Sequence, residues 1–266
     1  MLAREPGSGR DEAIRGLSVG VGETTRNGDR VARRTERALA VHRLLNSQSP
    51  NRPVPLSDKG RIALPDIQPP RADLVAALAM RRSGYAYEDR DLEFRALSAW
   101  LRFAVGVQRF VPAYGRPEHP LGMAPTAGGL PSLGVYVLVR RAEEVPSGLY
   151  RYEAVSHELV ELSTVDPTGA LELVYAQPEF ATRPAVSLAL TARLDVAFGQ
   201  YPLRHYRTLH VDSGVAVQNL YLVGTALGLS CCAVAEFDDA GLAALLGTPD
   251  TEIPTMLFAA GHAEQR

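Results

Sequence analysis

The segment from Thr208 to Leu229, TLHVDSGVAVQNLYLVGTALGL, restricts the possible folds more than any other part of this chain. It is typical of a helix of about six turns that is apolar over most of its surface and stops at Gly228. A helix with so little polar surface needs other elements around it, so we expect it at the centre of a packed domain. Asp212 and Gln218 or Asn219 must find hydrogen-bond partners if they are buried, and structural hydrogen bonding is at least as reasonable a role for them as catalysis.

The segments around this helix predict both strands and helices. Alternating or continuous apolar runs predict strands at 135–140, 148–153, 157–162, 185–192, 230–237 and 253–261. Apolar stripes and capping residues predict helices at 71–83, 92–107, 167–177 and 238–247. The two types alternate without the even spacing of repeated strand–helix–strand units, which favours an α+β fold with a mixed sheet.

The N-terminal part of the chain differs from the rest in composition. Residues 1–28 are rich in polar residues and lack an apolar period, so we expect a mostly disordered extension. Residues 29–70 are expected to form one helix, Asp29–Asn46, a proline-rich loop and an extended arm. The main domain is expected to span residues 71–266.

Charge and composition exclude several classes of function. A net charge of −2 argues against a general nucleic-acid-binding protein. Lys59 is the one lysine among 28 basic residues, so the motifs below cannot use lysine chemistry, and arginine stays charged and cannot replace it. The two cysteines, Cys231 and Cys232, are adjacent, which suggests a reducing compartment and small buried side chains instead of a metal site. There is no apolar run of about 18 residues and no secretory signal, so we expect a cytoplasmic protein that does not enter a membrane.

Two short motifs have the residue types of a ligand site. PTAGG, Pro125–Gly129, is followed directly by an apolar strand; it is either a simple turn or a loop whose backbone approaches a flat ligand. Arg81, Arg82 and Ser83 end a predicted helix, where arginines complement the helix dipole or, with the serine, clamp a phosphate.

A third motif, GQYPLRHYR at Gly199–Arg207, contains three side chains that can carry protons. These are Tyr201, His205 and Tyr206. The motif is either a solvated loop or the rim of a substrate site, where a neighbouring group would have to tune a tyrosine acting as acid or base.

Taken together, the order of these motifs resembles the FMN-dependent nitroreductase superfamily, and within it the SagB-type dehydrogenases that oxidise thiazolines and oxazolines in ribosomally made peptides. The resemblance runs from about Asp29 to His262 and rests on the glycine loop, the GLYRY…HELVEL hairpin and the helix YRTLHVDSG…QNLYLVGTALGL. It implies a nitroreductase-like fold, in which helices flank a mixed, mainly antiparallel sheet, and an interlocked homodimer with two FMN sites at its interface.

The resemblance also implies roles for particular residues. Arg81, Arg82 and Ser83 would hold the FMN phosphate and ribityl chain, Pro125, Thr126, Ala127, Gly128 and Gly129 would line the flavin ring from the other subunit, and Gln218, Cys232, Ala233, Val234 and Ala235 would complete the site. Tyr201, His205 and Tyr206 would be catalytic. The substrate would be a modified precursor peptide whose rings a cyclodehydratase has already formed.

Two positions differ from the family pattern. Tyr85 stands where an arginine often follows the serine, and Gln200-Tyr201 stands where azoline dehydrogenases typically have a Lys-Tyr pair. The alternatives are therefore a flavin reductase that uses NAD(P)H on a nitro, quinone or dehydroamino-acid substrate, or a non-catalytic scaffold subunit of a peptide-modifying complex.

Overall fold

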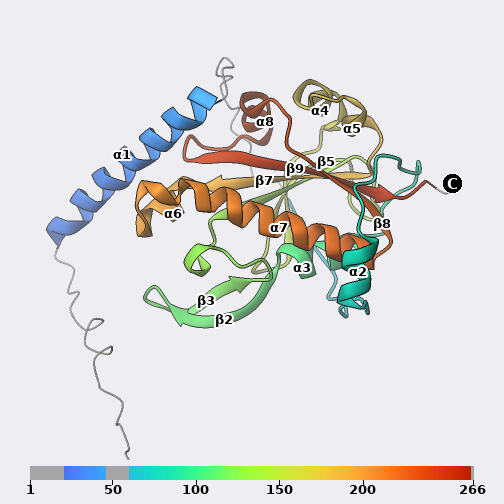
Figure 1. The fold of residues 1–266 in the computed structure, drawn as a ribbon, viewed down its shortest axis with the longest axis horizontal. Helices are drawn as coiled ribbons and strands as arrows, with labels where there is room; N and C mark the ends of the chain where they lie inside the picture. Colours follow the sequence, from blue (N-terminus) through green and yellow to red (C-terminus); the bar gives the residue numbers. More distant parts are fainter. Residues whose placement is uncertain (1–20, 46–59, 265–266) are drawn as a thin grey trace, which may run out of the picture.

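The structure is a computed structural model that describes residues 21–45 and 60–264. The predicted proline-rich loop, most of the predicted disordered extension and Lys59 lie outside the described residues. Among the described residues, the model contains one large sheet, one two-stranded sheet and helices on both faces of the large sheet (Figure 1).

The large sheet has seven strands in the order β1-β6-β5-β4-β7-β9-β8. The strands are β1 (Gly60–Ala63), β4 (Leu133–Val139), β5 (Gly148–Glu153), β6 (Glu158–Ser163), β7 (Val186–Arg193), β8 (Leu229–Val234) and β9 (Glu252–His262). Every neighbouring pair in this sheet is antiparallel, and parallel pairing is confined to isolated bridges such as Ser83 to Cys231. The structure thus confirms the predicted α+β class and the mainly antiparallel sheet.

Two hydrophobic clusters cover the two faces of this sheet. Because side chains alternate along a strand, Val135, Val137 and Val139 of β4 pack toward α3 and α7, whereas Tyr136 and Leu138 pack toward α4, α5 and α8. The helices on the first side are α2 (Leu74–Met80), α3 (Phe94–Val105) and α7 (Tyr206–Ala226), and those on the second are α4 (Thr168–Val174), α5 (Glu179–Thr182) and α8 (Asp239–Leu246).

The central helix α7 buries one stripe of its surface. Its buried residues are Leu209, Asp212, Ser213, Ala216, Leu220, Tyr221 and Gly224, and the Trp100 indole of α3 donates a hydrogen bond to the Leu220 carbonyl at 2.9 Å. The helix ends before Gly228, whose φ of +74° favours glycine. Val211, on another side of α7, is 62% exposed, so the expected burial over most of the helix surface is not complete within a single chain.

The N-terminal helix α1 (Val21–Leu45) lies against α6 (Leu194–Gln200) at the end of α7 (Figure 1). It begins eight residues before the predicted start at Asp29, and extending an existing helix costs little free energy per residue. Ala38 of α1 is buried with Phe198 of α6. The Arg34 guanidinium donates to the carbonyl oxygens of Tyr201 at 3.0 Å and Phe198 at 3.4 Å, so α1 holds the short segment that leads into α7 through η3 (Leu203–His205).

A second, two-stranded sheet was not predicted. It consists of β2 (Val107–Ala113) and β3 (Arg116–Gly122), which lie below α7 in Figure 1. Pro112, Pro117 and Pro120 occur within it, and prolines in a sequence argue against a strand. In a two-stranded sheet each strand has a free edge, so the prolines need not remove a ladder hydrogen bond.

Candidate active site

The glycine loop is a short 3-10 turn, η2 (Ala127–Gly129), directly before β4. Gly128 and Gly129 have φ values of +64° and +67°, which L-residues with a side chain rarely adopt. Thr126 closes the turn: its carbonyl accepts from the Gly129 amide at 2.9 Å, and its hydroxyl donates to the Leu130 carbonyl at 2.6 Å. The glycines are therefore needed for the backbone shape.

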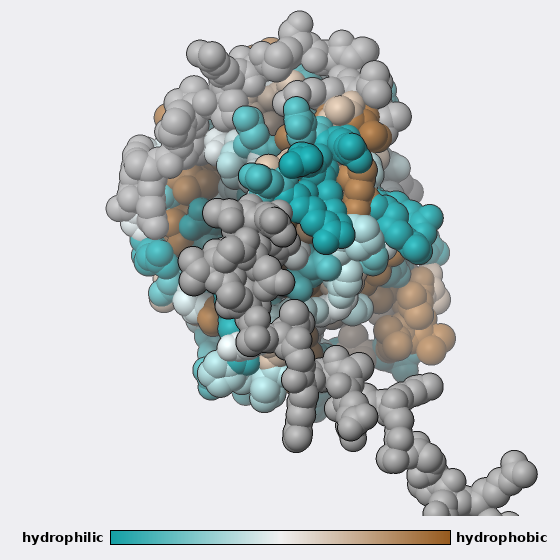
Figure 2. Space-filling view, turned by 90° about the vertical axis from the view of Figure 1, so that its left-hand side faces the viewer, coloured by the Kyte–Doolittle hydropathy of each residue, from teal (hydrophilic) through white to brown (hydrophobic). Residues whose placement is uncertain are grey.

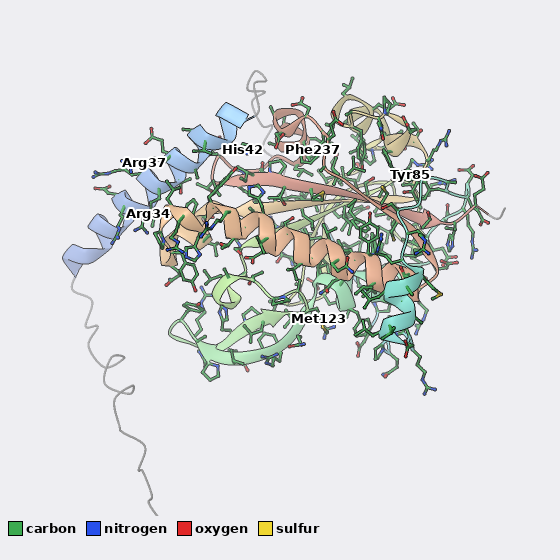
Figure 3. All side chains as sticks on the ribbon, in the orientation of Figure 1. Arg34, Arg37, His42, Tyr85, Met123 and Phe237 are labelled. Carbon is green, nitrogen blue, oxygen red and sulfur yellow. The ribbon has the colours of Figure 1, made fainter. Side chains whose placement is uncertain are left out.

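Side chains from α7 fix the start of this loop. The Ala127 amide donates a hydrogen bond to the Asp212 carboxylate at 3.0 Å. Burial raises the pKa of Asp212 above its usual value, although this hydrogen bond and the nearby His205 oppose part of the rise. The Asn219 amide donates to the Met123 carbonyl at 3.2 Å, in the part of the chain just below α7 (Figure 3). Of the predicted polar residues on α7, Asp212 and Asn219 have structural partners, while Gln218 is exposed.

Two side chains of the β2–β3 hairpin bind the glycine carbonyls. The Tyr114 hydroxyl donates to the Gly128 carbonyl at 2.7 Å, and His119 Nε2 lies 2.8 Å from the Gly129 carbonyl. His119 is buried, and the Tyr114 ring packs against it at a centroid distance of 5.0 Å with an interplanar angle of 57°. The hairpin therefore supports the loop from the side opposite Asp212.

The Tyr201 hydroxyl lies against Gly128. A Cβ atom on Gly128 would be 2.0 Å from Tyr201 Oη and 2.7 Å from Tyr114 Oη, so the space that a side chain would need holds two phenol hydroxyls. Desolvation first, and then the hydrogen bond with Tyr201, raise the pKa of Tyr114. The His205 ring stacks on the Tyr201 ring at 4.4 Å with an interplanar angle of 17°. Tyr201 and His205 thus meet at the glycine loop.

The third candidate, Tyr206, points elsewhere. Its hydroxyl lies 3.4 Å from His42 Nδ1 of α1, and His42 Nε2 lies 3.4 Å from an Asp239 carboxylate oxygen of α8. His210 packs edge-on against the Tyr206 ring at 4.9 Å. Burial raises the pKa of Asp239 to about 6 and lowers that of His210. Tyr206 therefore belongs to a polar cluster between α1, α7 and α8.

A second group of predicted site residues gathers around Tyr221, near the other end of α7. The Tyr221 hydroxyl accepts from the Ala233 amide of β8 at 2.7 Å and shares a hydrogen bond with the Ser83 hydroxyl at 3.0 Å. The Gly84 amide donates to the Cys231 carbonyl at 2.8 Å. These bonds bring the Ser83 segment beside β8, as a shared ligand site requires.

The two arginines of this group have different surroundings. The Arg81 guanidinium lies over the Tyr221 ring, 5.1 Å from its centroid. Arg82 Nη1 donates to the Ala79 and Arg81 carbonyls at 2.7 and 2.8 Å, and so binds the end of α2. Tyr85 is 62% exposed and packs edge-on against Phe180, 6.0 Å between centroids.

The remaining predicted cofactor residues follow β8 to its end. Cys232 and Val234 are buried, Ala233 is half-buried, and Ala235 is exposed beyond the strand; Pro125 is also exposed. Both cysteines are free thiols, and burial raises the pKa of Cys231 to about 12. This agrees with the prediction of small buried side chains. No group of three metal-ligating side chains occurs in residues 21–45 and 60–264.

One helix therefore positions both groups. Asp212 binds the glycine loop and Tyr221 binds the Ser83 segment, and their separation of nine residues corresponds to about 14 Å along α7. A ligand that touches both groups has to be elongated, or the two groups have to come from different subunits.

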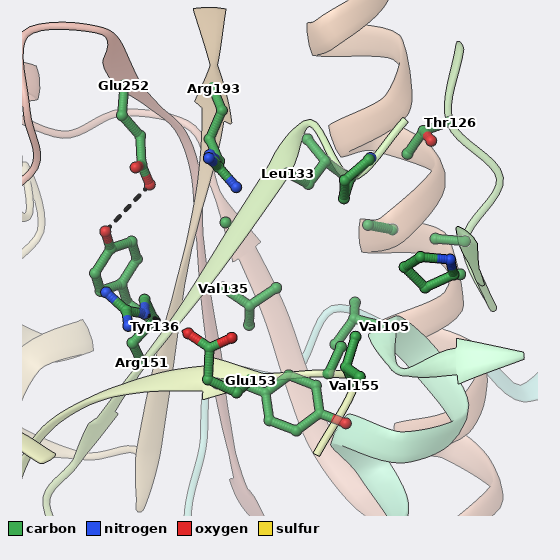
Figure 4. Close-up of a pocket in the computed structure, with 18 of the residues that line it drawn as sticks. Val105, Thr126, Leu133, Val135, Tyr136, Arg151, Glu153, Val155, Arg193 and Glu252 are labelled. Carbon is green, nitrogen blue, oxygen red and sulfur yellow. Dashed lines mark hydrogen bonds and ion pairs between the residues drawn. The ribbon is translucent and has the colours of Figure 1, made fainter. Parts of the chain in front are cut away.

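A cavity of about 590 Å³ lies behind the glycine loop (Figure 4). Thr126 and Gly129 line it, together with the first residues of β4, which pair with β7 but not with β5. Its polar end contains Glu252, whose carboxylate accepts from Tyr136 at 3.1 Å and from Thr191. Tyr201 and His205 are not part of its lining, so the cavity and this pair contact different parts of the loop.

Sequence reasoning missed three residues that shape the site. Tyr114 and His119 lie in the β2–β3 hairpin, which was not predicted. Tyr221 lies in the central helix, whose sequence is mostly apolar. Tyr221 lies in the helix that was expected to be packed at the centre of the domain, and a buried tyrosine usually needs a partner for its hydroxyl, so Tyr221 had a detectable signal. The hairpin residues had none before the hairpin itself was known.

A seven-stranded antiparallel sheet, a central helix and a glycine loop before the middle strand β4 define the class of protein. The family model described as Nitroreductase family matches residues 78–262, and the chain belongs to this family of oxidoreductases. This confirms the superfamily that the order of the motifs resembles. No helix in residues 21–45 and 60–264 is long and apolar enough to cross a membrane.

Two proteins named as nitroreductases are similar to this chain. A protein of Methanocaldococcus jannaschii named as a nitroreductase is 30% identical over 207 residues, covering 78% of this chain and 98% of that protein. A crystal structure of a protein from Anabaena variabilis, also named as a nitroreductase, superposes with a TM-score of 0.65 at 24% identity and covers 77% of this chain, which spans only 42% of that longer chain.

Two further solved structures share the fold. A chain of the Escherichia coli microcin synthetase McbBCD complex, solved with truncated pro-MccB17 bound, has a TM-score of 0.63 at 19% identity; 93% of this chain and 99% of that chain are covered. A nitroreductase-named protein from Desulfovibrio desulfuricans, solved in complex with FMN, has a TM-score of 0.50 at 16% identity over 73% of this chain and 88% of that chain.

Proposed function

We propose that this protein is an FMN-dependent dehydrogenase that oxidises thiazoline or oxazoline rings to thiazoles or oxazoles in a ribosomally made peptide. The observation that carries the proposal is the Tyr201 hydroxyl placed against Gly128 of the glycine loop, with the His205 imidazole stacked on its ring. This arrangement puts a proton-carrying group at the loop that, by family resemblance, faces the flavin.

The residues fit FMN at both groups. Because Gly128 has no side chain of its own, the Tyr201 hydroxyl can lie against the loop beside a flat ring, and Arg81 and Ser83 offer a cation and a hydroxyl for a phosphate. When bound, FMN would accept the hydride equivalent from the substrate ring. The Desulfovibrio relative solved with FMN supports this cofactor.

A homodimer would bring the two groups together on one flavin. In this proposal the glycine loop of one subunit covers the flavin that the Arg81–Ser83 segment of the other subunit holds. α2 supports a second copy, because its large side chains Leu74, Val75, Leu78 and Met80 are between 49% and 72% exposed. Exposed apolar side chains of this number in one short helix are typical of an interface.

The chain's own part in the reaction is positioning and proton removal. Oxidation of an azoline ring removes two hydrogens, one as a hydride equivalent and one as a proton. Tyr201 would accept this proton as its phenolate, after its own hydroxyl proton has passed to the neighbouring His205 imidazole, a group that carries protons near neutral pH. Asp212 and Tyr114 keep the loop at the phenol. Gln200 contributes no base, so Tyr201 would act without the lysine of related dehydrogenases. We leave Tyr206 out of this mechanism, because it faces His42 and not the loop.

The microcin synthetase chain supports the kind of substrate and partner. That complex was solved with truncated pro-MccB17 bound, and this chain matches one chain of the complex over 99% of that chain's length. We accordingly propose a modified precursor peptide as the substrate and a cyclodehydratase as the partner that forms the rings.

The test combines a visible spectrum with a mass measurement. The purified protein should be yellow, and under air it should remove the mass of one H₂ per ring from an azoline-containing peptide. Tyr201→Phe should abolish this loss and keep the flavin, whereas Tyr206→Phe should keep both. Full activity of Tyr201→Phe would remove Tyr201 from the mechanism.

Two other outcomes would replace the proposal. Yellow protein that leaves the rings unchanged but is bleached by NAD(P)H would be a flavin reductase, as the names of several relatives suggest. Protein that is colourless and cannot be reconstituted with FMN would be a non-catalytic scaffold.

A further inference from the structure

Four arginines lie along one side of α1. Arg30, Arg33, Arg34 and Arg37, together with Leu203 of η3, line a groove of about 420 Å³. We propose that this groove binds an acidic segment of the peptide substrate and so holds the peptide beside Tyr201. This inference rests on the proposed function for the identity of the peptide.

The spacing of the arginines explains the groove. Positions i, i+3, i+4 and i+7 fall on one side of a helix, within an arc of about 100°. Thr35 and Ala38 lie on a different side of α1 and are buried. Arg34 and Arg37 are labelled on α1 in Figure 3, and the face of the molecule on which α1 lies shows a broad hydrophilic area (Figure 2).

Three of these arginines extend into solvent without an ion-pair partner among the described residues. Arg30, Arg33 and Arg37 are exposed, and among the described residues none of them forms an ion pair. The two acidic residues of this part of α1, Asp29 and Glu36, lie four residues before and three residues after Arg33, at one edge of the arginine side, and leave the charges of Arg30, Arg34 and Arg37 unopposed. The groove therefore presents a positive field to a ligand.

The fourth arginine connects the groove to the candidate active site. Arg34 donates to the Tyr201 carbonyl at 3.0 Å, and Leu203 follows Tyr201 by two residues. A ligand in the groove consequently contacts the same short segment that holds the Tyr201 phenol at the glycine loop.

The dimensions favour a peptide over a nucleic acid. Arg30 to Arg37 spans about 10.5 Å of helix, which matches about three residues of an extended peptide. A single-stranded nucleic acid would need aromatic surfaces for its bases, whereas the non-arginine residue of this groove is Leu203. The net charge of −2 also disfavours a polyanion that contacts the whole protein. The expected ligand is a short extended segment with two or three carboxylates.

The test measures binding of a defined probe to the full-length protein as purified. The probe is a fluorescein-labelled hexapeptide of alternating Glu and Gly, its control is the same peptide with Gln for Glu, and the readout is fluorescence anisotropy at low salt. Arg33→Gln/Arg37→Gln should weaken binding of the Glu probe about tenfold, as expected for two exposed charge pairs. Arg71→Gln/Arg95→Gln removes the same charge from other exposed positions and should leave binding unchanged.

The proposal fails if both double variants bind the Glu probe equally, if the Gln probe binds as tightly as the Glu probe, or if a labelled oligo-dT of equal charge binds more tightly. Failure of the proposed function is separate, because probe binding is measured without turnover. If azoline oxidation does occur, Arg33→Gln/Arg37→Gln should raise KM for a precursor with an acidic segment and leave kcat unchanged.

Discussion

Replacing Gly128 by alanine tests the contact on which the candidate site depends. Gly128 has a φ of +64°, and an added Cβ would lie 2.0 Å from the Tyr201 hydroxyl oxygen. Ordinary contacts of a Cβ atom begin near 3.4 Å, so this hydroxyl would have to move by about 1.4 Å. The substitution therefore strains the backbone and displaces the phenol.

The expected cost has two parts. An alanine in the left-handed region costs about 1–2 kcal/mol. Forcing a methyl group into a filled space adds about 1–3 kcal/mol. Gly128→Ala should thus lower the free energy of unfolding by about 2–5 kcal/mol. Gly228→Ala is the matched control, because Gly228 has a φ of +74° with nothing within 4 Å of the added Cβ, and it should show the first part alone.

Chemical denaturation of the FMN-loaded protein at one protein concentration measures these differences. A double-mutant cycle with Tyr201→Phe isolates the contact: without the hydroxyl, Gly128→Ala should cost about 1–2 kcal/mol less. Equal costs for Gly128→Ala and Gly228→Ala, with no dependence on Tyr201, would refute the placement of the phenol against the loop.

Three further predictions concern other parts of the site. Arg81→Gln should weaken FMN binding more than Arg82→Gln does, because the Arg82 guanidinium already binds the Ala79 and Arg81 carbonyls. Flavin fluorescence measures both affinities, and the opposite order would argue against Arg81 as the phosphate ligand. Asn219→Ala should lower the free energy of unfolding by about 1–3 kcal/mol, because it leaves the Ala104 and Met123 carbonyls without their hydrogen-bond donor. Gln218 is exposed, so Gln218→Ala should change the free energy of unfolding by less than about 0.5 kcal/mol. Burial raises the pKa of Asp239 from 3.8 to about 6, so the folded state binds the carboxyl proton more tightly than the unfolded state does. Relative to Asp239→Asn, the protein should therefore lose stability as the pH rises from about 4 to about 6. Denaturation of both proteins at pH 4, 5, 6 and 7 measures this difference, and a difference that does not change with pH would contradict the prediction.

The sequence predicted the elements with a strong apolar pattern. The strands around Val135–Val139, the hairpin of GLYRYE and HELVEL, and the central helix all appear with boundaries within a few residues. Their burial follows directly from periodicity, which depends on each residue and its near neighbours. The nitroreductase family was recognisable because these elements occur in a characteristic order.

The support of the site could not be predicted in the same way. Asp212 was expected to need a partner, but the partner is the Ala127 amide, 85 residues away in the sequence. The separation of Tyr206 from Tyr201 and His205 depends on where α1 and α8 pack, which no local pattern encodes. The β2–β3 hairpin, with its prolines and exposed surface, has the composition of a loop. FMN binding, the homodimer and the catalytic roles remain predictions.

Both residue groups are attached to α7, so the length and the rotation of this helix set their positions relative to each other. Inserting one residue between Asp212 and Tyr221 would lengthen the interval by about 1.5 Å but rotate Tyr221 by about 100° relative to Asp212. The angular change would turn the Tyr221 hydroxyl away from Ser83 and Ala233 even though the sheet and the loop kept their own geometry. The number of residues between these two side chains is thus fixed by rotation more strictly than by distance, and this helix could be lengthened without loss of the contacts of Tyr221 only by whole turns.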